Sequence, residues 1–527
     1  MTRPSVLVAD ALGDEGLALL RDVADVTVST GLDESGLRAA LVGHDALLVR
    51  SATKVTARAL EGADRLALIG RAGIGVDNID LDAATARGIV VMNTPDAGAT
   101  TTAEHAIALL VALARQIPAA DHNLKSGQWD KKRFVGVELT GKVFGVVGLG
   151  NIGRIVAERG LGLAMEVLAH DPFVTPDRAP AGVRLVDLDE LCARADFVSI
   201  HVPLMPATVH LFDADRLGKL KRGARLVHAA RGGIVDDRAL LAALESGHLA
   251  GAALDVFETE PLPADHPFRS RSDVILTPHI GASTHEAQRN VAVDLARQVV
   301  ACLRNGVVLN GVNVPRIAPG QAALLTPFLD LAHRLAAFVC GLHAGRLESL
   351  RLTMQGAIAE SAPRPLTVAA LCGALHGRID RTVTPVNAER IAEELGIRVV
   401  REASTLKRDF VNLLRIEVLI DGERHRVSGT VLGQRHPRLL EYDDRQLDAI
   451  PEPPLLVTWH HDRPGVLGKI ATSLGEMQRN IARLQLGAPP HAGDEALGIF
   501  NLDAVLAAEQ LLALEALPGV VKARQIG

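Results

Sequence analysis

The segment Val143-Phe-Gly-Val-Val147 followed by Gly148-Leu-Gly-Asn-Ile-Gly153 decides how the central part of this chain folds. Its first half is a short apolar run rich in valine, which is typical of a buried strand. Its second half spaces three glycines as Gly-x-Gly-x-x-Gly, and a helical stretch begins near Arg154. Such glycines permit a tight turn, close approach of a ligand to the backbone, and close packing of the helix. The helix N-terminus attracts phosphates, so the segment predicts a dinucleotide site.

An acidic residue stands where such sites bind the ribose. Asp171 follows the strand Glu166-Val-Leu-Ala-His170 and lies about 20 residues beyond the glycines. A carboxylate there accepts hydrogen bonds from the ribose hydroxyls and repels the 2′-phosphate of NADP. We therefore predict NAD as the cofactor and a Rossmann-type, doubly wound α/β domain. The alternatives are a glycine-rich turn in an unrelated α/β protein, and Asp171 as a simple strand-end cap.

The composition narrows the class of protein. The 527 residues are 48% hydrophobic, which is enough for three or four separate cores. A net charge of -6 with no long basic run argues against nucleic acid or an anionic membrane as a partner. The longest apolar stretch, Ala106 to Ala114, is about half of a bilayer span. Four scattered cysteines without a Cys-x-x-Cys motif indicate reduced thiols in a cytoplasmic protein, and we expect no metal site.

Periodicity and breaker residues divide the chain into further units. Short strands alternate with helices up to about residue 95, which predicts a parallel α/β sheet, and a second α/β series begins near Lys142. The segment Thr284 to Arg304 is predicted to be one long helix that returns to the first unit. A link at Pro315 to Gly320 precedes a mixed region, and the stiff Pro451-Glu-Pro-Pro454 precedes a βαββαβ pattern.

Three polar residues downstream of the glycines have the chemistry of an acid–base site. Arg231 follows a strand, where a guanidinium can bind a carboxylate with two parallel hydrogen bonds. His279 follows another strand and can accept a hydroxyl proton as a hydride leaves the carbon. Glu258 is predicted to be its carboxylate partner. Taken singly, the three are also compatible with a surface ion pair, a loop histidine and a solvated charge; their order favours a dehydrogenase.

Residues 1 to about 312 resemble the D-isomer-specific 2-hydroxyacid dehydrogenases, and the resemblance is highly specific. It implies a discontinuous substrate-binding domain of residues 1–95 and 283–314, flavodoxin-like in fold, and an NAD-binding domain of residues 96–282. The matching motifs, besides the glycines, are Val49-Arg-Ser-Ala-Thr-Lys54, Gly70-Arg-Ala-Gly-Ile-Gly-Val-Asp-Asn-Ile79, His201-Val-Pro-Leu204, Ala230-Arg-Gly-Gly233, Asp255-Val-Phe-Glu258 and Pro278-His-Ile-Gly-Ala282.

The resemblance also implies site residues. The catalytic set is Arg231, Glu258 and His279. The cofactor-binding set is Ile74, Gly148, Gly150, Asn151, Ile152, Gly153, Asp171, Val202, Ala229, Ala230, Arg231, Asp255, His279, Ile280, Gly281 and Ala282. The substrate-binding set is Arg50, Ser51, Arg71, Gly73 and Gly75.

The choice of hydroxy acid depends on two arginines and on the C-terminal half. Arg50 and Arg71 are two cations beside small residues, and a spare guanidinium suits a phosphate; the alternative is that they support the fold or an interface. Val383-Thr-Pro-Val-Asn-Ala-Glu-Arg-Ile391 and Val427-Ser-Gly-Thr-Val-Leu432 resemble the added domain of the long family members that oxidise D-3-phosphoglycerate. The resemblance implies an α+β intervening domain at residues 317–450, and 3-phosphohydroxypyruvate as product in the first step of serine synthesis.

The last unit, residues 455–527, resembles an ACT domain. His460-His-Asp-Arg-Pro-Gly465 stands between a strand and a helix, where Asp462 can cap the helix. The resemblance implies L-serine as an effector at an interface of two such domains, contacted by His460, Asp462 and Asn480. A plain dimerising domain without a ligand is the alternative. The expected assembly is a homodimer or homotetramer.

Two other functions fit parts of this pattern. A glyoxylate or hydroxypyruvate reductase shares the catalytic set but ignores a phosphate and lacks the two added domains. A cofactor-sensing corepressor shares the fold without the reaction, since fold alone does not give activity. The intact trio and the absence of a basic extension argue against the corepressor.

Overall fold

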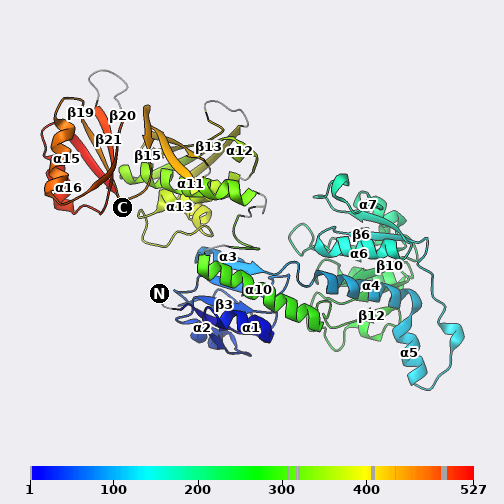
Figure 1. The fold of residues 1–527 in the computed structure, drawn as a ribbon. Coiled ribbons are helices and arrows are strands. Elements are labelled where there is room, and N and C mark those ends of the chain that lie inside the picture. Colours follow the sequence, from blue (N-terminus) through cyan, green and yellow to red (C-terminus); the bar gives the residue numbers. More distant parts are fainter. Residues whose placement is uncertain are drawn as a thin grey trace.

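The computed structural model describes residues 3–305, 308–315, 317, 321–361, 363–404, 410–433, 435–487 and 495–527. Four β-sheets follow one another along these residues. We call them the N-terminal, central, intervening and terminal units, and Figure 1 shows each with its own helices. Of the predicted link at Pro315 to Gly320, only Pro315 and Ile317 lie within the described residues.

The N-terminal unit is built on a parallel sheet with strand order β2-β1-β3-β4-β5, which is the flavodoxin-like order predicted from the sequence. The strands other than the edge strand β2 are largely buried runs such as Ala46–Val49, as expected for a parallel sheet covered on both faces. The elements are β1 (Ser5–Val8), α1 (Asp14–Arg21), β2 (Asp25–Val28), α2 (Glu34–Leu41), β3 (Ala46–Val49), β4 (Leu68–Arg71), α3 (Leu81–Ala86) and β5 (Val90–Asn93).

A helix from far along the chain completes this unit. Helix α10 (His285–Asn305) begins at the central unit and packs against α1, and it is the long green helix of Figure 1. The approach is close, because a Cβ on Gly16 would lie 2.6 Å from the carbonyl oxygen of Ala292. Leu295 and Val299 of α10 are fully buried in the same core as Val6. The predicted helix Thr284 to Arg304 is therefore confirmed.

The central unit has a seven-stranded parallel sheet with order β12-β11-β10-β9-β6-β7-β8. From β6 the chain adds strands first toward one edge of the sheet and then, from β9 on, toward the other edge. This change of direction between β6 and β9 is the doubly wound topology predicted from the glycines. The strands are β6 (Val143–Val147), β7 (Glu166–His170), β8 (Val183–Leu185), β9 (Phe197–Ile200), β10 (Arg225–His228), β11 (Gly251–Leu254) and β12 (Val274–Leu276). The helices are α4 (Ala99–Arg115), α5 (Ile117–Lys125), α6 (Asn151–Gly162), α7 (Leu188–Arg194), α8 (Ala214–Lys219) and α9 (Asp237–Glu245).

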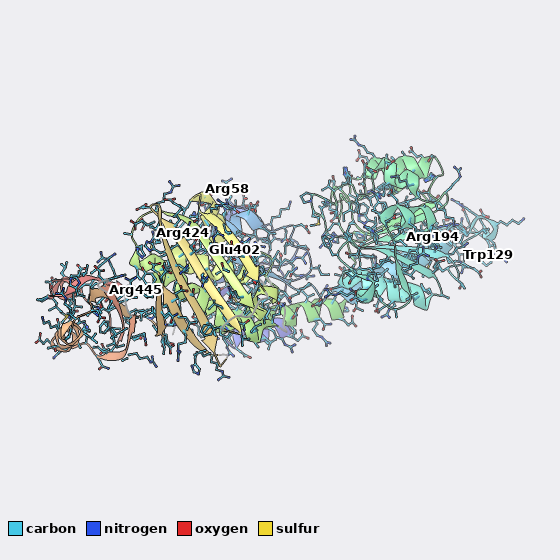
Figure 2. All side chains as sticks on the ribbon, turned by 90° about the horizontal axis from the view of Figure 1, so that it is seen from above. Arg58, Trp129, Arg194, Glu402, Arg424 and Arg445 are labelled. Carbon is cyan, nitrogen blue, oxygen red and sulfur yellow. The ribbon has the colours of Figure 1, made fainter. Side chains whose placement is uncertain are left out.

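The intervening unit is a six-stranded sheet with order β14-β13-β15-β16-β17-β18, and helices α11 and α13 pack on it. Its other face carries charged side chains, among them Glu402 and Arg424 (Figure 2), and Arg424 contacts Glu417 at 3.6 Å. The elements are α11 (Ala322–Leu342), β13 (Leu347–Gly356), α12 (Ala357–Ser361), α13 (Pro363–Leu375), α14 (Ala388–Glu394), β14 (Arg398–Ser404), β15 (Asn412–Ile420), β16 (Glu423–Leu432), β17 (His436–Tyr442) and β18 (Arg445–Ala449).

Helix α11 is a longer apolar segment than the uninterrupted run Ala106 to Ala114, although Asp330 and Arg334 interrupt it. Ala323–Leu342 is long and apolar enough to cross a membrane by length and composition, and Ala106 to Ala114 is shorter. Leu331, Leu335 and Val339 are fully buried in the core of the intervening unit. The helix therefore has the burial of a core helix, which passes the same test of length and composition.

The terminal unit has the predicted βαββαβ order and a sheet of order β20-β21-β19-β22. Leu456, Ile470 and Phe500 are fully buried between this sheet and its helices. All four cysteines of the chain are free in this structure. The elements are β19 (Leu455–His461), α15 (Val466–Glu476), β20 (Ile481–Gly487), β21 (Glu495–Leu502), α16 (Ala508–Glu515) and β22 (Val520–Ile526).

Candidate active site

The candidate active site lies at the carboxyl ends of three neighbouring parallel strands. Arg231, Asp255 and His279 follow β10, β11 and β12. Strands β10 and β11 pair in register from Arg225↔Gly251, and β11 pairs with β12 from Ala252↔Val274. Ligands of open α/β sheets bind at this edge, so the topology brings the three polar side chains to one crevice.

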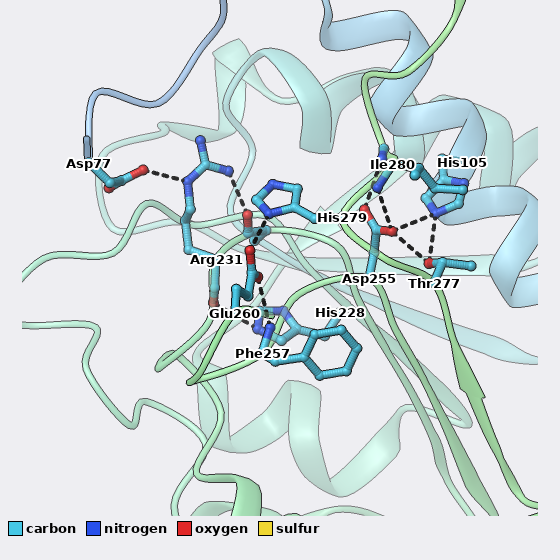
Figure 3. Close-up of polar contacts among 12 residues, drawn as sticks. Asp77, His105, His228, Arg231, Asp255, Phe257, Glu260, Thr277, His279 and Ile280 are labelled. Atoms are coloured by element: carbon cyan, nitrogen blue, oxygen red, sulfur yellow. Dashed lines mark hydrogen bonds and ion pairs between the residues drawn. The ribbon is translucent and has the colours of Figure 1, made fainter. Parts of the chain in front are cut away.

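His279 has a carboxylate partner, and it is Glu260 rather than the predicted Glu258. The ring Nδ1 lies 2.7 Å from Oε2 of Glu260 (Figure 3). The other oxygen, Oε1, accepts a hydrogen bond of 3.0 Å from the amide of Phe257. The chain turns back on itself after β11, and this turn directs Glu260 toward the crevice. The signal in the sequence was a second glutamate two residues further on, directly before Pro261.

Glu258 has a different role. Its Oε1 lies 3.1 Å from Nε2 of His210 and accepts a hydrogen bond of 3.1 Å from the amide of Asp237. That amide belongs to the first turn of α9, so Glu258 helps to satisfy a helix N-terminus. Burial, and then the charge of Glu258, raise the pKa of Asp237 to about 6.

Opposing effects set the charge of Glu260. Burial raises its pKa, but the hydrogen bonds from His279 and the Phe257 amide and the charges of His279 and Arg231 outweigh burial. The net result is a pKa below the ordinary value, so Glu260 is an anion at neutral pH. An ionised carboxylate on Nδ1 orients the ring and leaves Nε2 for proton transfer.

Asp255 shapes the backbone around His279. Its Oδ1 accepts hydrogen bonds from the Thr277 hydroxyl at 2.6 Å and the Ile280 amide at 2.9 Å, and Oδ2 accepts one from the Gly281 amide at 2.8 Å. The residue is 1% exposed. His279 itself has a φ of 52°, a left-handed conformation that costs a non-glycine residue free energy. The bonds from Asp255 hold the segment that contains this strain (Figure 3).

Arg231 joins the central unit to the N-terminal unit. Its Nε donates to Oδ2 of Asp77 at 2.9 Å, and an Nη donates to the carbonyl of Ala230 at 2.6 Å (Figure 3). A Cβ on Gly75 would lie 2.0 Å from the other Nη, so a side chain there would displace the guanidinium. His228 lies 2.9 Å from the Arg231 carbonyl through Nε2, and burial lowers the pKa of this histidine to about 4.

Arg71 is a cation that is largely buried beside Arg231. Burial, and then the charge of Arg231, lower the pKa of Arg71 to about 10. One Nη donates to the Ala72 carbonyl at 3.3 Å, whereas the buried Nε has no hydrogen-bond partner among the described residues. A Cβ on Gly73 would lie 1.5 Å from Nη1. A buried guanidinium with spare donors favours an anionic ligand at this place.

The glycine-rich turn has the geometry that a dinucleotide requires. Gly148 has a φ of 94°, and a Cβ on Gly153 would lie 1.8 Å from the Gly148 carbonyl. A Cβ on Gly150 would meet no heavy atom of the described residues within 4 Å, so the backbone is open to a ligand there. The first turn of α6 begins at Asn151, whose side chain bonds to Asp96. These residues therefore fit a bound pyrophosphate.

Asp171 supports the same turn. It stands directly after β7, and its Oδ2 accepts a hydrogen bond of 2.8 Å from the amide of Leu149. Its Oδ1 accepts one of 2.9 Å from the amide of Phe173. The carboxylate therefore lies next to the glycine-rich turn, as a ribose acceptor must.

The remaining predicted cofactor and substrate residues lie around the crevice. The carbonyl of Ile74 accepts from the Asn93 amide group at 2.6 Å, and the amide of Arg50 donates to Asp10 at 2.6 Å. Ala229 and Gly281 are buried, Ile152, Val202 and Ala230 are partly exposed, and Ser51, Ile280 and Ala282 are exposed.

The predicted effector residues lie at two ends of the terminal sheet: His460 and Asp462 stand where β19 ends, and Asn480 precedes β20 at the opposite end. His460 is 3% exposed, and its Nδ1 lies 3.3 Å from the Thr458 hydroxyl. Asp462 and Asn480 are exposed, and the amide of Asn480 donates to Asp503 at 3.1 Å. Helix α15 begins after Gly465, whose φ is 89°, and has no side-chain cap. The prediction that Asp462 caps this helix is therefore wrong, because the chain turns at Gly465, three residues beyond Asp462.

Comparison with known proteins points to one kind of enzyme. Residues 107–281 match the D-isomer specific 2-hydroxyacid dehydrogenase, NAD binding domain, and residues 324–443 match the D-3-phosphoglycerate dehydrogenase intervening domain. D-3-phosphoglycerate dehydrogenase of Synechocystis is 42% identical over 94% of this chain and 90% of its own length.

Two solved structures each match about three fifths of this chain. A glyoxylate reductase from Paecilomyes thermophila is 28% identical with a TM-score of 0.56, and covers 61% of this chain and 100% of its own. D-lactate dehydrogenase from Aquifex aeolicus, solved with NAD and lactic acid, is 28% identical with a TM-score of 0.52, and covers 59% of this chain and 100% of its own.

Proposed function

This chain belongs to the D-3-phosphoglycerate dehydrogenase family of NAD-dependent 2-hydroxyacid dehydrogenases, and we propose that it oxidises D-3-phosphoglycerate to 3-phosphohydroxypyruvate. The observation that carries the proposal is the crevice itself. It combines a histidine–carboxylate pair, a guanidinium at the end of β10, and a second, buried guanidinium with unused donors. We further propose that the product enters serine synthesis.

The crevice supports a simple division of roles. NAD, when bound on the glycine-rich turn, supplies the acceptor for the hydride of the 2-carbon. Nε2 of His279 takes the hydroxyl proton, while Glu260 on Nδ1 stabilises the imidazolium that forms. Arg231 holds the substrate carboxylate and polarises the developing carbonyl. The catalytic set proposed is therefore Arg231, Glu260 and His279, with Asp171 as ribose acceptor.

Arg71 is the proposed phosphate ligand. The phosphate of the substrate needs hydrogen-bond donors from the protein. Arg71 offers a guanidinium that is largely buried and incompletely hydrogen-bonded. Arg50 is its proposed companion, since its charge acts on Arg71 and its side chain bonds only weakly to the Ala11 carbonyl at 3.4 Å. Two guanidinium groups at one place suit a dianion better than the methyl group of lactate.

The same family contains a competing function. The glyoxylate reductase covers 61% of this chain, whereas the phosphoglycerate dehydrogenase of Synechocystis covers 94%, which favours the phosphorylated substrate. A cofactor-sensing corepressor has no use for the strained His279 and its bonded carboxylate. We keep the reductase as the second candidate.

The assignment of the four units is also a proposal. Residues 1–95 with 283–314 are the substrate-binding domain, 96–282 the NAD-binding domain, 317–450 the intervening domain and 455–527 the ACT domain. L-serine is the proposed effector, and His460, Asp462 and Asn480 its proposed contacts. The matched intervening domain and the βαββαβ order of the terminal unit support this assignment.

We propose a homodimer through the central unit, extended to a tetramer by the terminal units. Helix α5 and the segment after it carry exposed apolar side chains, Ile117, Leu124, Trp129 and Val135, with Trp129 83% exposed. Figure 2 shows Trp129 on the outermost part of the central unit. A protruding apolar segment of this kind is typical of an interface between subunits.

A substrate panel tests the proposed reaction. Reduction of NAD is measured with D-3-phosphoglycerate, D-glycerate, D-lactate and glycolate, and the reverse reaction with hydroxypyruvate and glyoxylate. The proposal predicts the highest kcat/KM with D-3-phosphoglycerate. Equal or higher values with the unphosphorylated acids would overturn it in favour of the reductase, and inactivity on all of them with intact NAD binding would favour the corepressor.

A further inference from the structure

A cluster of two histidines, an aspartate and a tyrosine lies in the intervening unit, far from the active site along the chain. His343 directly follows α11, His425 belongs to β16, and Asp443 stands in the turn between β17 and β18. One ligand atom from each of these three residues lies within 4.8 Å of the other two. The three residues are partly buried, with 13% of the His425 side chain and 27% of the Asp443 side chain exposed.

We propose that His343, His425 and Asp443 bind a divalent transition metal ion, with Zn²⁺ as the best match. Two imidazoles and a carboxylate are a frequent zinc set, and three protein ligands leave a position for water. Neighbouring ligand atoms of a tetrahedral zinc ion are about 3.4 Å apart. The ligand atoms of the cluster lie within 4.8 Å of one another, and the two imidazole rings are stacked, so a ring must rotate before both can face one ion. The expectation from the sequence that the chain holds no metal is replaced by this proposal.

The rings of the two histidines are held by their surroundings. The imidazole rings of His343 and His425 are stacked, with centroids 3.4 Å apart and planes 17° apart. Nε2 of His343 lies 2.7 Å from the Tyr442 hydroxyl, which leaves Nδ1 for an ion. A hydrogen bond to the second ring nitrogen is the usual way in which a metal-bound histidine is held.

Asp443 is equally well held. Its Oδ1 accepts a hydrogen bond of 2.7 Å from the amide of Arg426, and its Oδ2 lies 2.9 Å from Nδ1 of His425. The amide of Asp443 in turn donates to the Arg426 carbonyl at 2.9 Å. One carboxylate oxygen is thus fixed by the backbone while the other faces the histidines, which is the arrangement of a single-oxygen metal ligand.

The position of the cluster indicates what a bound ion does. It joins the end of α11 to the β17–β18 turn of the same sheet, and α11 also packs against β22 of the terminal unit. A Cβ on Gly341 would lie 3.4 Å from Cγ1 of Ile526, which shows how close this contact is. The proposed ion is therefore structural, and it stiffens the junction between the intervening and terminal units.

Metal titration of the full-length chain tests the proposal. After removal of metals with EDTA and dialysis, Zn²⁺ is added in a calorimeter and Co²⁺ in a spectrophotometer. We expect one equivalent of metal per chain, with a dissociation constant of roughly micromolar or tighter. We also expect an absorption spectrum that indicates a low coordination number for the bound Co²⁺. A wild-type chain that binds no stoichiometric metal overturns the proposal and leaves an ordinary hydrogen-bonded cluster.

Variants locate the ion. The variants His343→Ala and His425→Ala are expected to lose the bound equivalent of Zn²⁺. The control variant His436→Ala, which changes an exposed histidine on β17, is expected to keep it. Stoichiometric Zn²⁺ binding by either His343→Ala or His425→Ala overturns the assignment. X-ray absorption of the wild-type zinc complex needs no variant: two imidazole ligands without sulfur support the site, and any other count of imidazoles, or a sulfur ligand, overturns it. The outcome is independent of the proposed dehydrogenase reaction.

Discussion

Nε of Arg231, in the central unit, donates a hydrogen bond of 2.9 Å to Oδ2 of Asp77, in the N-terminal unit. The pair joins the two sides of the crevice in the absence of a ligand. The same guanidinium is the proposed partner of the substrate carboxylate, so Asp77 and the substrate compete for one cation. Asp77 is 59% exposed, which makes it easy to displace.

Asp77→Asn removes this competitor. We expect KM for the acidic substrate to fall by about 2- to 5-fold, which is the range of a solvent-exposed ion pair, with kcat little changed. Steady-state kinetics at low ionic strength measures the effect. Asp82→Asn in the neighbouring helix α3 is the control, and an unchanged or raised KM in Asp77→Asn would show that the two do not compete.

The two glutamates after β11 are predicted to differ sharply. Glu260→Gln removes the charge next to His279 and is expected to lower kcat/KM by on the order of 10²-fold. Glu258→Gln removes a bond to α9 and is expected to stay within about 2-fold of the wild type, since such exposed contacts have small effects. NAD affinity, measured by fluorescence titration, is expected to be the same in all three chains. The opposite ranking of the two variants would restore the original choice of Glu258.

Arg71→Met tests the phosphate site. Loss of a charge-assisted hydrogen bond is expected to raise KM for D-3-phosphoglycerate by about 10- to 100-fold. The slower reaction with D-glycerate is expected to change little, because that acid has no phosphate. Arg58→Met, on the exposed surface of the same unit, is the matched control. Equal losses on both substrates would mean that Arg71 supports the fold instead.

Asp171→Asn tests cofactor choice. The amide oxygen of asparagine still accepts the hydrogen bond from Leu149, so the glycine-rich turn is preserved, while the charge that repels a 2′-phosphate is gone. We expect the preference for NAD over NADP, as a ratio of kcat/KM, to fall by about 10-fold or more. Asp177→Asn, which is exposed, serves as the comparison. If the preference for NAD over NADP is unchanged in Asp171→Asn, Asp171 does not bind the ribose.

The raised pKa of Asp237 leads us to expect that the free energy of unfolding depends on pH. Its pKa is about 6 in the folded chain, because of burial and then Glu258, against 3.8 as the ordinary value. A raised carboxyl pKa means that the unfolded chain releases its proton first. Stability is therefore lost as the pH rises from about 4 to about 6, by up to about 3 kcal/mol, and stays lower above that range.

Asp237→Asn is expected to abolish that loss. Thermal unfolding of the variant and the wild type at about pH 4 and about pH 7 measures the difference, and the variant is expected to be the more stable only at the higher pH. Asp265→Asn, at an exposed position further along the chain, is expected to follow the wild type. An equal stability difference at both values would mean that the charge of Asp237 is not the cause.

The sequence was sufficient to predict those parts of the fold that are specified by local sequence motifs. The glycine-rich turn, Asp171 after its strand, and the helix α10 were all predicted from residues within one or two elements of each other. The βαββαβ order of the terminal unit was predicted because each strand is a short apolar run between turns. The six-stranded sheet was not, since β14 pairs with β13 across about 50 residues and its strands mix charged and apolar positions.

The site shows the same limit at the scale of single residues. Glu258 and Glu260 are two positions apart, and only the turn after β11 decides which reaches His279. The cluster of His343, His425 and Asp443 combines residues from a helix end, a strand and a turn. Such a set has no fixed spacing along the chain, so no motif announces it.

Helix α10 has a consequence for synthesis on the ribosome. Leu295 and Val299 fill the core beneath β4, yet they are translated after the whole central unit. When the first 95 residues leave the exit tunnel, one apolar face of their sheet is only partly covered, by Leu17 and Leu20 of α1. The second unit to be made is thus the first that can finish folding, and the nascent N-terminal sheet has to wait for a helix translated about 200 residues later.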